Sequence, residues 1–286
     1  MVSSGFETYL RTTPLALIAI AATFTACVDH SSFETTHIDV QFVSEVVSVA
    51  PGQPFWVGLV QTVDSGWHTY WRNPGDSGAA TRINIDLPNG WSKSPIQWPY
   101  PERMPFGTLV NYGYTGQVLL PIQITPPDVL DSGKIKLTAE VLWIVCADVC
   151  IPGEAELTLR LPVRSQPGEP DLKIAPLFDL SRTQLPTEAS GISHAERRDG
   201  YIAITVQFPD PVDWDQIWYF PHIDNTVVHA ADQQHSITAS GAVELLVKSG
   251  PVVTARVNGT VVFGSGDSAR SYILDIPVTE VSTAHD

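Results

Sequence analysis

Alternating hydrophobic and polar positions run through most of the chain from His37 onward. Every second residue from Ala155 to Leu161 is apolar, and Ile135 to Val145 alternates before it becomes continuously apolar. A two-residue period is typical of a strand that buries one face. Turn sequences such as Pro88-Asn89-Gly90 separate these segments. Many short strands between proline and glycine turns predict an all-β fold of the sandwich type.

The strand pattern is interrupted between residues 164 and 190. Gln166 to Pro170 is rich in proline and glycine, whereas Ala175 to Leu180 predicts one short helix. With 286 residues, the chain is long enough for two domains with separate cores. The second has no cysteine and no dense polar cluster, so we expect a spacer or docking module. The predicted organisation is two β-sandwich domains in tandem, residues 33–163 and 191–286, joined by a linker over 164–190.

Residues 1–26 have the pattern of a signal peptide. Arg11 is their only basic residue, and the apolar run from Leu15 to Ala22 is too short to span a bilayer. Cys27 follows directly, as the lipidated cysteine does in a bacterial lipoprotein signal. Phe24 departs from that pattern, because leucine is usual at its position, so simple cleavage before Cys27 is the alternative. Both interpretations predict an exported protein, with a possible lipid anchor at Cys27.

The charge balance argues against nucleic acid as a partner. Asp and Glu number 31 against 16 Lys and Arg, and the net charge of −15 would repel nucleic acids and anionic membrane surfaces. The sequence shows no glycine-rich phosphate loop, no defensible Ser–His–Asp arrangement and no paired-carboxylate site. We therefore expect no cofactor and no resident metal ion, which leaves the cysteines as the candidate chemistry.

Cys146 and Cys150 lie where one predicted strand passes into the next. Four extended residues span roughly 13 Å, whereas bonded cysteines have Cα atoms about 4.4–6.8 Å apart. A disulfide here therefore requires the chain to fold back through residues 147–149. So small a ring contributes only on the order of 2 kcal/mol, and exposed disulfides are the labile ones. A structural disulfide and a soft-metal site for Cu(I) or Zn remain open alternatives.

Several long blocks resemble the N-terminal periplasmic region of the DsbD family of thiol:disulfide interchange proteins. The closest likeness is to its ScsB branch, which is linked to suppression of copper sensitivity. The segments that carry the resemblance are Val49–Gly58, Gly66–Gly78, Ile96–Pro99, Leu109–Tyr114 and Val145–Glu154. The likeness is weaker in the second domain, through Trp218–Pro221 and Tyr272–Pro277. The resemblance implies that both sandwiches are immunoglobulin-like.

The resemblance also implies a function as a component of a protein-disulfide reductase. Cys146 and Cys150 would be a redox pair that receives electrons from a membrane-embedded DsbD- or ScsB-type conduit and passes them to periplasmic thioredoxin-like proteins. Family members cover this pair with a cap loop, which corresponds here to Glu102–Gly107. The residues expected around the pair are Met104 and Phe106 as the lid, His68 and Tyr70 beside the cysteines, and Tyr112 and Tyr114 as packing or cap.

Full-length members of the family continue into a transmembrane conduit and a thioredoxin-like domain, whereas this sequence ends at Asp286. We expect the protein to borrow a reductant, to be a separately encoded subunit, or to be a fragment. In the exchange reaction, Cys150 is expected to attack a partner's disulfide and Cys146 to resolve it. Asp148 would raise a thiol pKa, so reactivity would depend on access rather than on a strongly activated thiolate.

Two other functions fit the same residues. Cys146, Cys150 and either His68 or Met104 could bind Cu(I), which would make the chain a copper-tolerance protein. Alternatively, the disulfide could be inert, and the chain would then be a non-catalytic binding lipoprotein. The reduction potential of the cysteine pair distinguishes these functions from electron relay.

Overall fold

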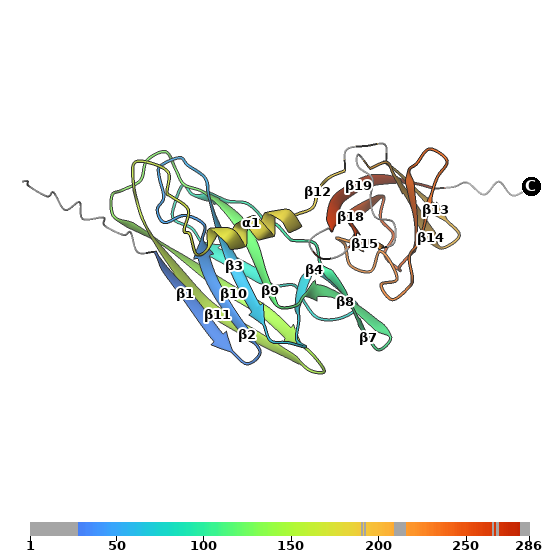
Figure 1. Cartoon of the computed structure of the whole chain (residues 1–286), viewed down its shortest axis with the longest axis horizontal. Helices are drawn as coiled ribbons and strands as arrows, with labels where there is room; N and C mark the ends of the chain where they lie inside the picture. Colours follow the sequence, from blue (N-terminus) through green and yellow to red (C-terminus); the bar gives the residue numbers. More distant parts are fainter. Residues whose placement is uncertain are drawn as a thin grey trace, which may run out of the picture.

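The computed structural model describes residues 28–189, 191, 193–208, 216–264, 266 and 269–280. The predicted signal peptide and Cys27 lie outside these residues. Within them the fold consists of strands and one short helix, arranged as two β-rich units that lie side by side (Figure 1). The predicted all-β class is confirmed. The first unit contains β1 to β11 and the second contains β12 to β19, with the helix between them.

The first unit is built on a sheet in the order β5-β10-β11-β1-β2-β3-β9-β6. β1 joins its two halves, because it pairs with β11 at Asp29 and His30 and with β2 from Ser31 onward. It therefore begins ahead of the predicted domain start at residue 33. The strands of this sheet are β1 (Asp29–Thr35), β2 (Ile38–Ser44), β3 (Phe55–Val63), β5 (Arg82–Asp86), β6 (Ser92–Lys93), β9 (Gln117–Thr125), β10 (Lys134–Cys146) and β11 (Cys150–Pro162).

The two halves of this sheet enclose one hydrophobic core. On β10 the alternating residues Leu137, Ala139 and Val141 are at most 1% exposed, and they belong to the same buried cluster as Val40 and Phe42 of β2. Full burial of a large aliphatic side chain contributes roughly 1.5–3 kcal/mol. The alternation seen in the sequence therefore marks the inward face, and it leaves the residues between for the outer face of the β10–β11 hairpin.

A separate three-stranded sheet, β4-β8-β7, lies beside this sandwich. It contains β4 (Thr69–Gly75), β7 (Glu102–Phe106) and β8 (Leu109–Tyr114). Residues 102–106, expected to belong to a cap loop, form the strand β7 and pair with β8. Pro105 is tolerated because β7 is an edge strand, where a missing backbone N–H breaks no ladder.

The predicted helix is α1 (Ala175–Gln184), and it is docked on the first unit. Phe178 is 1% exposed and packs in a cluster with Val60 and Leu119. The Ser181 hydroxyl donates a hydrogen bond to the carbonyl of Leu119, with an O–O distance of 3.1 Å. The segment between the two units is therefore anchored over part of its length.

The second unit is a smaller β structure with its own core. Its main sheet has the order β15-β18-β19-β13-β14-β17-β16, with β12 pairing with β19. Ile204, Leu245 and Val261 are among its most buried residues. The strands are β12 (Thr187–Glu188), β13 (Ser193–Arg198), β14 (Tyr201–Val206), β15 (Ile217–Pro221), β16 (Gln234–Ile237), β17 (Val243–Lys248), β18 (Arg256–Phe263) and β19 (Arg270–Glu280).

β15 and the residues after it contact the first unit. Phe220 belongs to the core cluster of the first unit, and its ring centroid lies 6.1 Å from that of Trp71 on β4. The His222 ring lies 5.5 Å from Trp71, and its two nitrogens are within 2.9 Å of Asn258 Oδ1 and Thr260 Oγ1. A histidine therefore lies within the apolar contact between the units.

Protonation of His222 should weaken the fold. Burial, and secondarily the charge of Arg72, lowers the pKa of His222 to about 4 from its ordinary 6.5. Its contribution to stability is therefore complete above pH 6.5 and is lost as the pH falls towards 4, on the order of 3 kcal/mol in total. We expect His222→Gln to lose less unfolding free energy between pH 7 and 4.5 than the parent protein in urea denaturation. His235→Gln, at an exposed histidine, is the control, and equal pH dependence in all three proteins would contradict this role.

Candidate functional site

The Cys146–Cys150 disulfide closes the tip of the β10–β11 hairpin. Cys146 ends β10, Cys150 begins β11, and the two residues are direct partners in the ladder. The N–H and the C=O of Cys146 both bond to His68, each with an N–O distance of 2.9 Å. Cys146 therefore faces Cys150 as a non-hydrogen-bonded pair, the pairing in which opposite Cα atoms come closest. Their Cα separation is 4.2 Å, and the predicted folding back through residues 147–149 is confirmed.

The two sulfurs differ in access. Cys146 is 1% exposed, whereas Cys150 is exposed at the start of β11. A thiolate that attacks a disulfide must approach one sulfur and expel the other. The exposure of Cys150 makes it the cysteine that a partner can approach more easily. The expected order, in which Cys150 attacks and Cys146 resolves, stays a prediction.

Tyr70 lies directly beside the exposed cysteine. Its hydroxyl oxygen is 3.6 Å from Cys150 Sγ, and the tyrosine is 1% exposed. Since a disulfide sulfur carries no hydrogen, Tyr70 is the donor in this state. Burial raises the pKa of Tyr70, which keeps the hydroxyl protonated at neutral pH. The same hydrogen bond would be stronger to a Cys150 thiolate, because donors favour a charged acceptor.

The Tyr70 ring is held by a close backbone approach. A Cβ atom at Gly78 would lie 2.1 Å from Tyr70 Cζ, so only glycine leaves room for the ring. Gly78 also has a φ of +87°, a conformation that glycine adopts without steric cost. The ring is therefore packed against the backbone of the loop that follows β4.

His68 lies next to Tyr70. The two ring centroids are 5.2 Å apart, and within the described residues His68 Nε2 is buried without a hydrogen-bond partner. Burial lowers the pKa of His68, so the ring is neutral at neutral pH. It therefore supplies no positive charge to activate a neighbouring thiolate.

The residues expected to form a cap occupy the β7–β8 hairpin. Phe106 is 49% exposed, and Met104 is half-buried. Figure 1 shows this hairpin projecting to one side of the β10–β11 tip. Tyr112 and Tyr114 are buried, and their hydroxyls bond elsewhere, to His229 Nδ1 at 3.1 Å and to the Pro99 carbonyl at 2.7 Å. The role of Met104 and Phe106 as a lid stays a prediction.

A pocket next to the disulfide was not predicted from the sequence. Ile144 and Pro152 are cross-strand partners, each two positions from a cysteine, so strand alternation places them on the disulfide's face. That spacing is the signal that could have identified them. The pocket has a volume of about 490 Å³ and is lined by Ala79, Ala80, Arg82, Leu142, Trp143, Ile144, Pro152, Gly153 and Glu154.

No group of three or more His, Cys, Asp or Glu side chains gathers as potential metal ligands in the described part of the chain. A Cu(I) site would need both thiols released by reduction and a third ligand such as His68 or Met104. It therefore stays a hypothesis. The only helix among the described residues is too short and too polar to cross a membrane.

Comparison with known proteins identifies relatives of this fold. Residues 39–162 match the family model described as thiol:disulfide interchange protein DsbD, N-terminal. The N-terminal periplasmic domain of ScsB from Proteus mirabilis has a similar structure, with a TM-score of 0.63 and 18% identity over 85% of this chain and 94% of that one.

Two tandem immunoglobulin structures of titin also matched. Chimeric titin Z1Z2 carrying a peptide from decorin is 14% identical over 86% of this chain and 99% of its own, and domains A164–A165 are 13% identical over 88% and 99%. Their TM-scores of 0.18 are too low to indicate a shared fold. No curated protein sequence matched.

We predict that Gly153→Ala will destabilise the hairpin beneath the disulfide. A Cβ atom at Gly153 would lie 2.4 Å from Cε2 of Trp143, its cross-strand partner. Such overpacking costs about 1–3 kcal/mol. Trp143→Leu removes the clashing ring, so in urea denaturation the double variant should lose less than the sum of the two single losses. Additive losses would show that the ring is not the obstacle.

We also predict that, after reduction, iodoacetamide will alkylate Cys150 at least tenfold faster than Cys146, because only Cys150 is exposed. Peptide mass spectrometry over time would measure both rates in a chain carrying Cys27→Ser. Cys146→Ser and Cys150→Ser give each rate in isolation. Equal rates would contradict the asymmetry.

Proposed function

The chain carries a DsbD-family N-terminal domain over residues 39–162, and we propose that this domain exchanges electrons with other proteins through Cys146 and Cys150. The observation that carries this proposal is the disulfide at a hairpin tip between one exposed and one buried cysteine. The proposed source of electrons is a membrane-embedded conduit, and the proposed recipients are thioredoxin-like proteins. The proposed compartment is the periplasm.

The exchange proceeds in two displacements. A thiolate of the reducing partner attacks Cys150 Sγ, which forms a mixed disulfide, breaks the Cys146–Cys150 bond and releases Cys146 as a thiolate. The partner's second thiolate attacks its own sulfur of the mixed disulfide and releases Cys150 as a thiolate. Two electrons have then moved from the partner's dithiol to this pair, and two protons from the partner's thiols are available to it through solvent.

Delivery to an oxidised recipient reverses these steps. The Cys150 thiolate attacks a sulfur of the recipient's disulfide, and Cys146 then attacks Cys150 Sγ to re-form the ring and release the reduced recipient. Tyr70 supports both directions, because its hydroxyl, 3.6 Å from Cys150 Sγ, can stabilise the thiolate that departs or attacks.

The apolar surroundings of the disulfide suit a protein partner. Val149 in the turn is 61% exposed and Leu142 is 46% exposed. Together with the pocket beside Ile144 and Pro152, they provide apolar area next to the reactive sulfur. A partner that buries this area would bring its own thiol close to Cys150, so access rather than intrinsic activation would control the rate.

The reduction potential of the pair tests this proposal. We expect a value of roughly −120 to −270 mV, the range of exchange proteins, from thiol trapping in glutathione or dithiothreitol buffers. A value below about −300 mV would indicate a structural disulfide, as the binding-lipoprotein alternative requires. Resistance to oxidation caused by bound Cu(I) would favour the copper alternative instead.

Trapping of the partner proteins is a second, separate test of the proposal. In Cys146→Ala the exposed Cys150 can form a mixed disulfide that the missing cysteine cannot resolve. We expect covalent adducts of this variant with thioredoxin-like proteins in non-reducing gels, and none with the matched control Cys150→Ala. Adducts of equal abundance in both variants would count against Cys150 as the reactive cysteine.

A further inference from the structure

We propose that Asn73 is a positioning residue through which the second unit holds Tyr70 against Cys150 and so sets the reduction potential of the disulfide. The inference rests on the proposed function to the extent that the pair must be redox-active. The second unit would then influence the disulfide of the first unit through one buried side-chain hydrogen bond, from Asn73 to Pro221.

The β4 strand is not held by its own sheet over the relevant length. It pairs with β8 at Thr69 and Tyr70, and pairing resumes only at Gly75, with a shift of register between them. The residues between Tyr70 and Gly75 therefore lack regular ladder partners on β8. They need another support if Tyr70, at the edge of this gap, is to keep a fixed position.

The second unit supplies that support. Asn73 is 0% exposed, and its Nδ2 donates a hydrogen bond to the carbonyl of Pro221 at 2.8 Å. Two residues earlier, Trp71 packs against Phe220 and His222. The unpaired part of β4 thus contacts β15 through the Trp71 ring and through the Asn73 amide. Loss of that amide would leave the Pro221 carbonyl without this hydrogen bond.

The same amide also orders the loop that packs on the Tyr70 ring. Asn73 Oδ1 accepts a hydrogen bond from the Gly75 backbone N–H at 3.0 Å, and this begins the turn that leads to Gly78. Ser77 within that turn donates two hydrogen bonds to Asn111 Oδ1, at 2.9 and 3.1 Å. Asn73 therefore contacts both the strand that carries Tyr70 and the start of the loop beneath its ring, and Asp76 and Ser77 tie the rest of that loop to β8.

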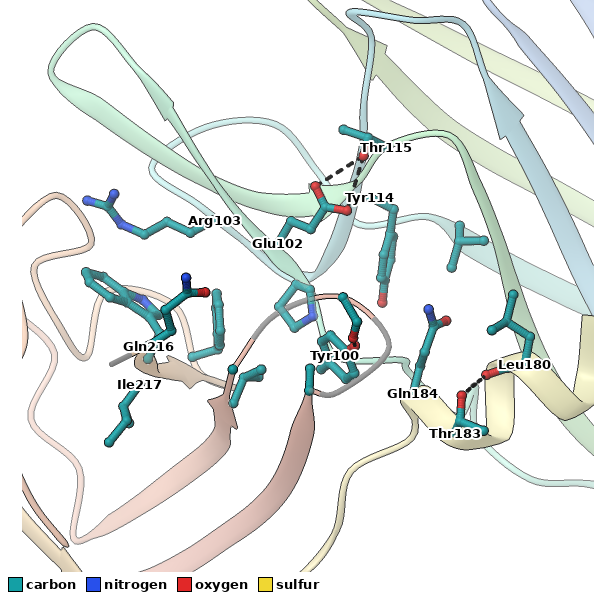
Figure 2. Close-up of a pocket in the computed structure, with 18 of the residues that line it drawn as sticks. Tyr100, Glu102, Arg103, Tyr114, Thr115, Leu180, Thr183, Gln184, Gln216 and Ile217 are labelled. Atoms are coloured by element: carbon teal, nitrogen blue, oxygen red, sulfur yellow. Dashed lines mark hydrogen bonds between the residues drawn. The ribbon is translucent and has the colours of Figure 1, made fainter. Parts of the chain in front are cut away.

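The contact between the two units is not continuous. Next to it lies a pocket of about 760 Å³, and Figure 2 shows Glu102 and Arg103 of β7, Leu180 and Gln184 of α1, and Ile217 of β15 around it. Within the lining of the pocket, Arg103 stacks on Trp218 with its Cζ 4.4 Å from the ring centroid. Neither Asn73 nor Pro221 lines this pocket, so their hydrogen bond lies in the closed part of the contact.

Displacement of Tyr70 should change the reduction potential of the disulfide in one direction. Its O–H bonds more strongly to a Cys150 thiolate than to a disulfide sulfur, so it favours the reduced pair. If Tyr70 moves away, the equilibrium shifts towards the disulfide and the reduction potential becomes more negative. A tenfold change in the equilibrium constant corresponds to about 30 mV for this two-electron couple.

A double-mutant cycle tests the inference in the full exported chain. We expect Tyr70→Phe and Asn73→Ala each to shift the equilibrium constant with glutathione threefold to tenfold towards the disulfide. The double variant should shift no further than the larger single effect, because Asn73 acts through the Tyr70 hydroxyl. Asn84→Ala, at an asparagine on β5 whose amide bonds Glu140, is the control and should stay within twofold of the parent.

Asn73→Asp provides a second variant if Asn73→Ala does not fold. It keeps an oxygen for the Gly75 N–H but loses the donor to Pro221. A shift like that of Tyr70→Phe supports the interdomain bond as the cause. A parental equilibrium constant in folded Asn73→Asp, or shifts that add in the double variant, would overturn the inference. Either result can occur while the reduction potential of the unmodified protein stays in the range of exchange proteins. The inference about Asn73 can therefore fail without the proposed function failing.

Discussion

The candidate site depends on the backbone pairing of one residue, Cys146. Both of its peptide groups bond to His68, so it must meet Cys150 from the non-hydrogen-bonded side of the hairpin. In that orientation opposite Cα atoms come closest, and here the disulfide joins Cα atoms 4.2 Å apart across a three-residue turn. The His68 contact also fixes the start of β4, and it therefore places Tyr70, two residues further on, beside Cys150.

This arrangement separates the roles of two chemically identical residues. Cys146 ends β10 and is 1% exposed, whereas Cys150 begins β11 on the exposed side of the hairpin tip. The two buried rings beside the pair are neutral, because burial lowers the pKa of His68 and raises that of Tyr70. Stabilisation of a thiolate at Cys150 must therefore come from a hydrogen-bond donor rather than from a nearby cation.

The second unit contains no cysteine, but it contacts the first unit directly. From composition it is a spacer or docking module, but its β15 strand contributes Phe220 to the core of the first unit. It also holds buried groups of β4 and β8, through Pro221 and His229. The second unit thus contacts the strands that present the site, and these contacts are the basis of the proposed link to the disulfide.

The sequence by itself determined the features that depend on near neighbours. Alternation along β10 and β11 marked the buried face, and the four-residue spacing of the cysteines required a reversal of the chain. The sequence did not reveal the edge strand at residues 102–106, expected as part of a cap loop, because pairing with β8 has no local signature. Tertiary structure decided which cysteine is exposed, where the Tyr112 hydroxyl bonds and what Asn73 holds. The partners in those last two hydrogen bonds lie 117 and 148 positions apart, a separation at which no periodic pattern carries information.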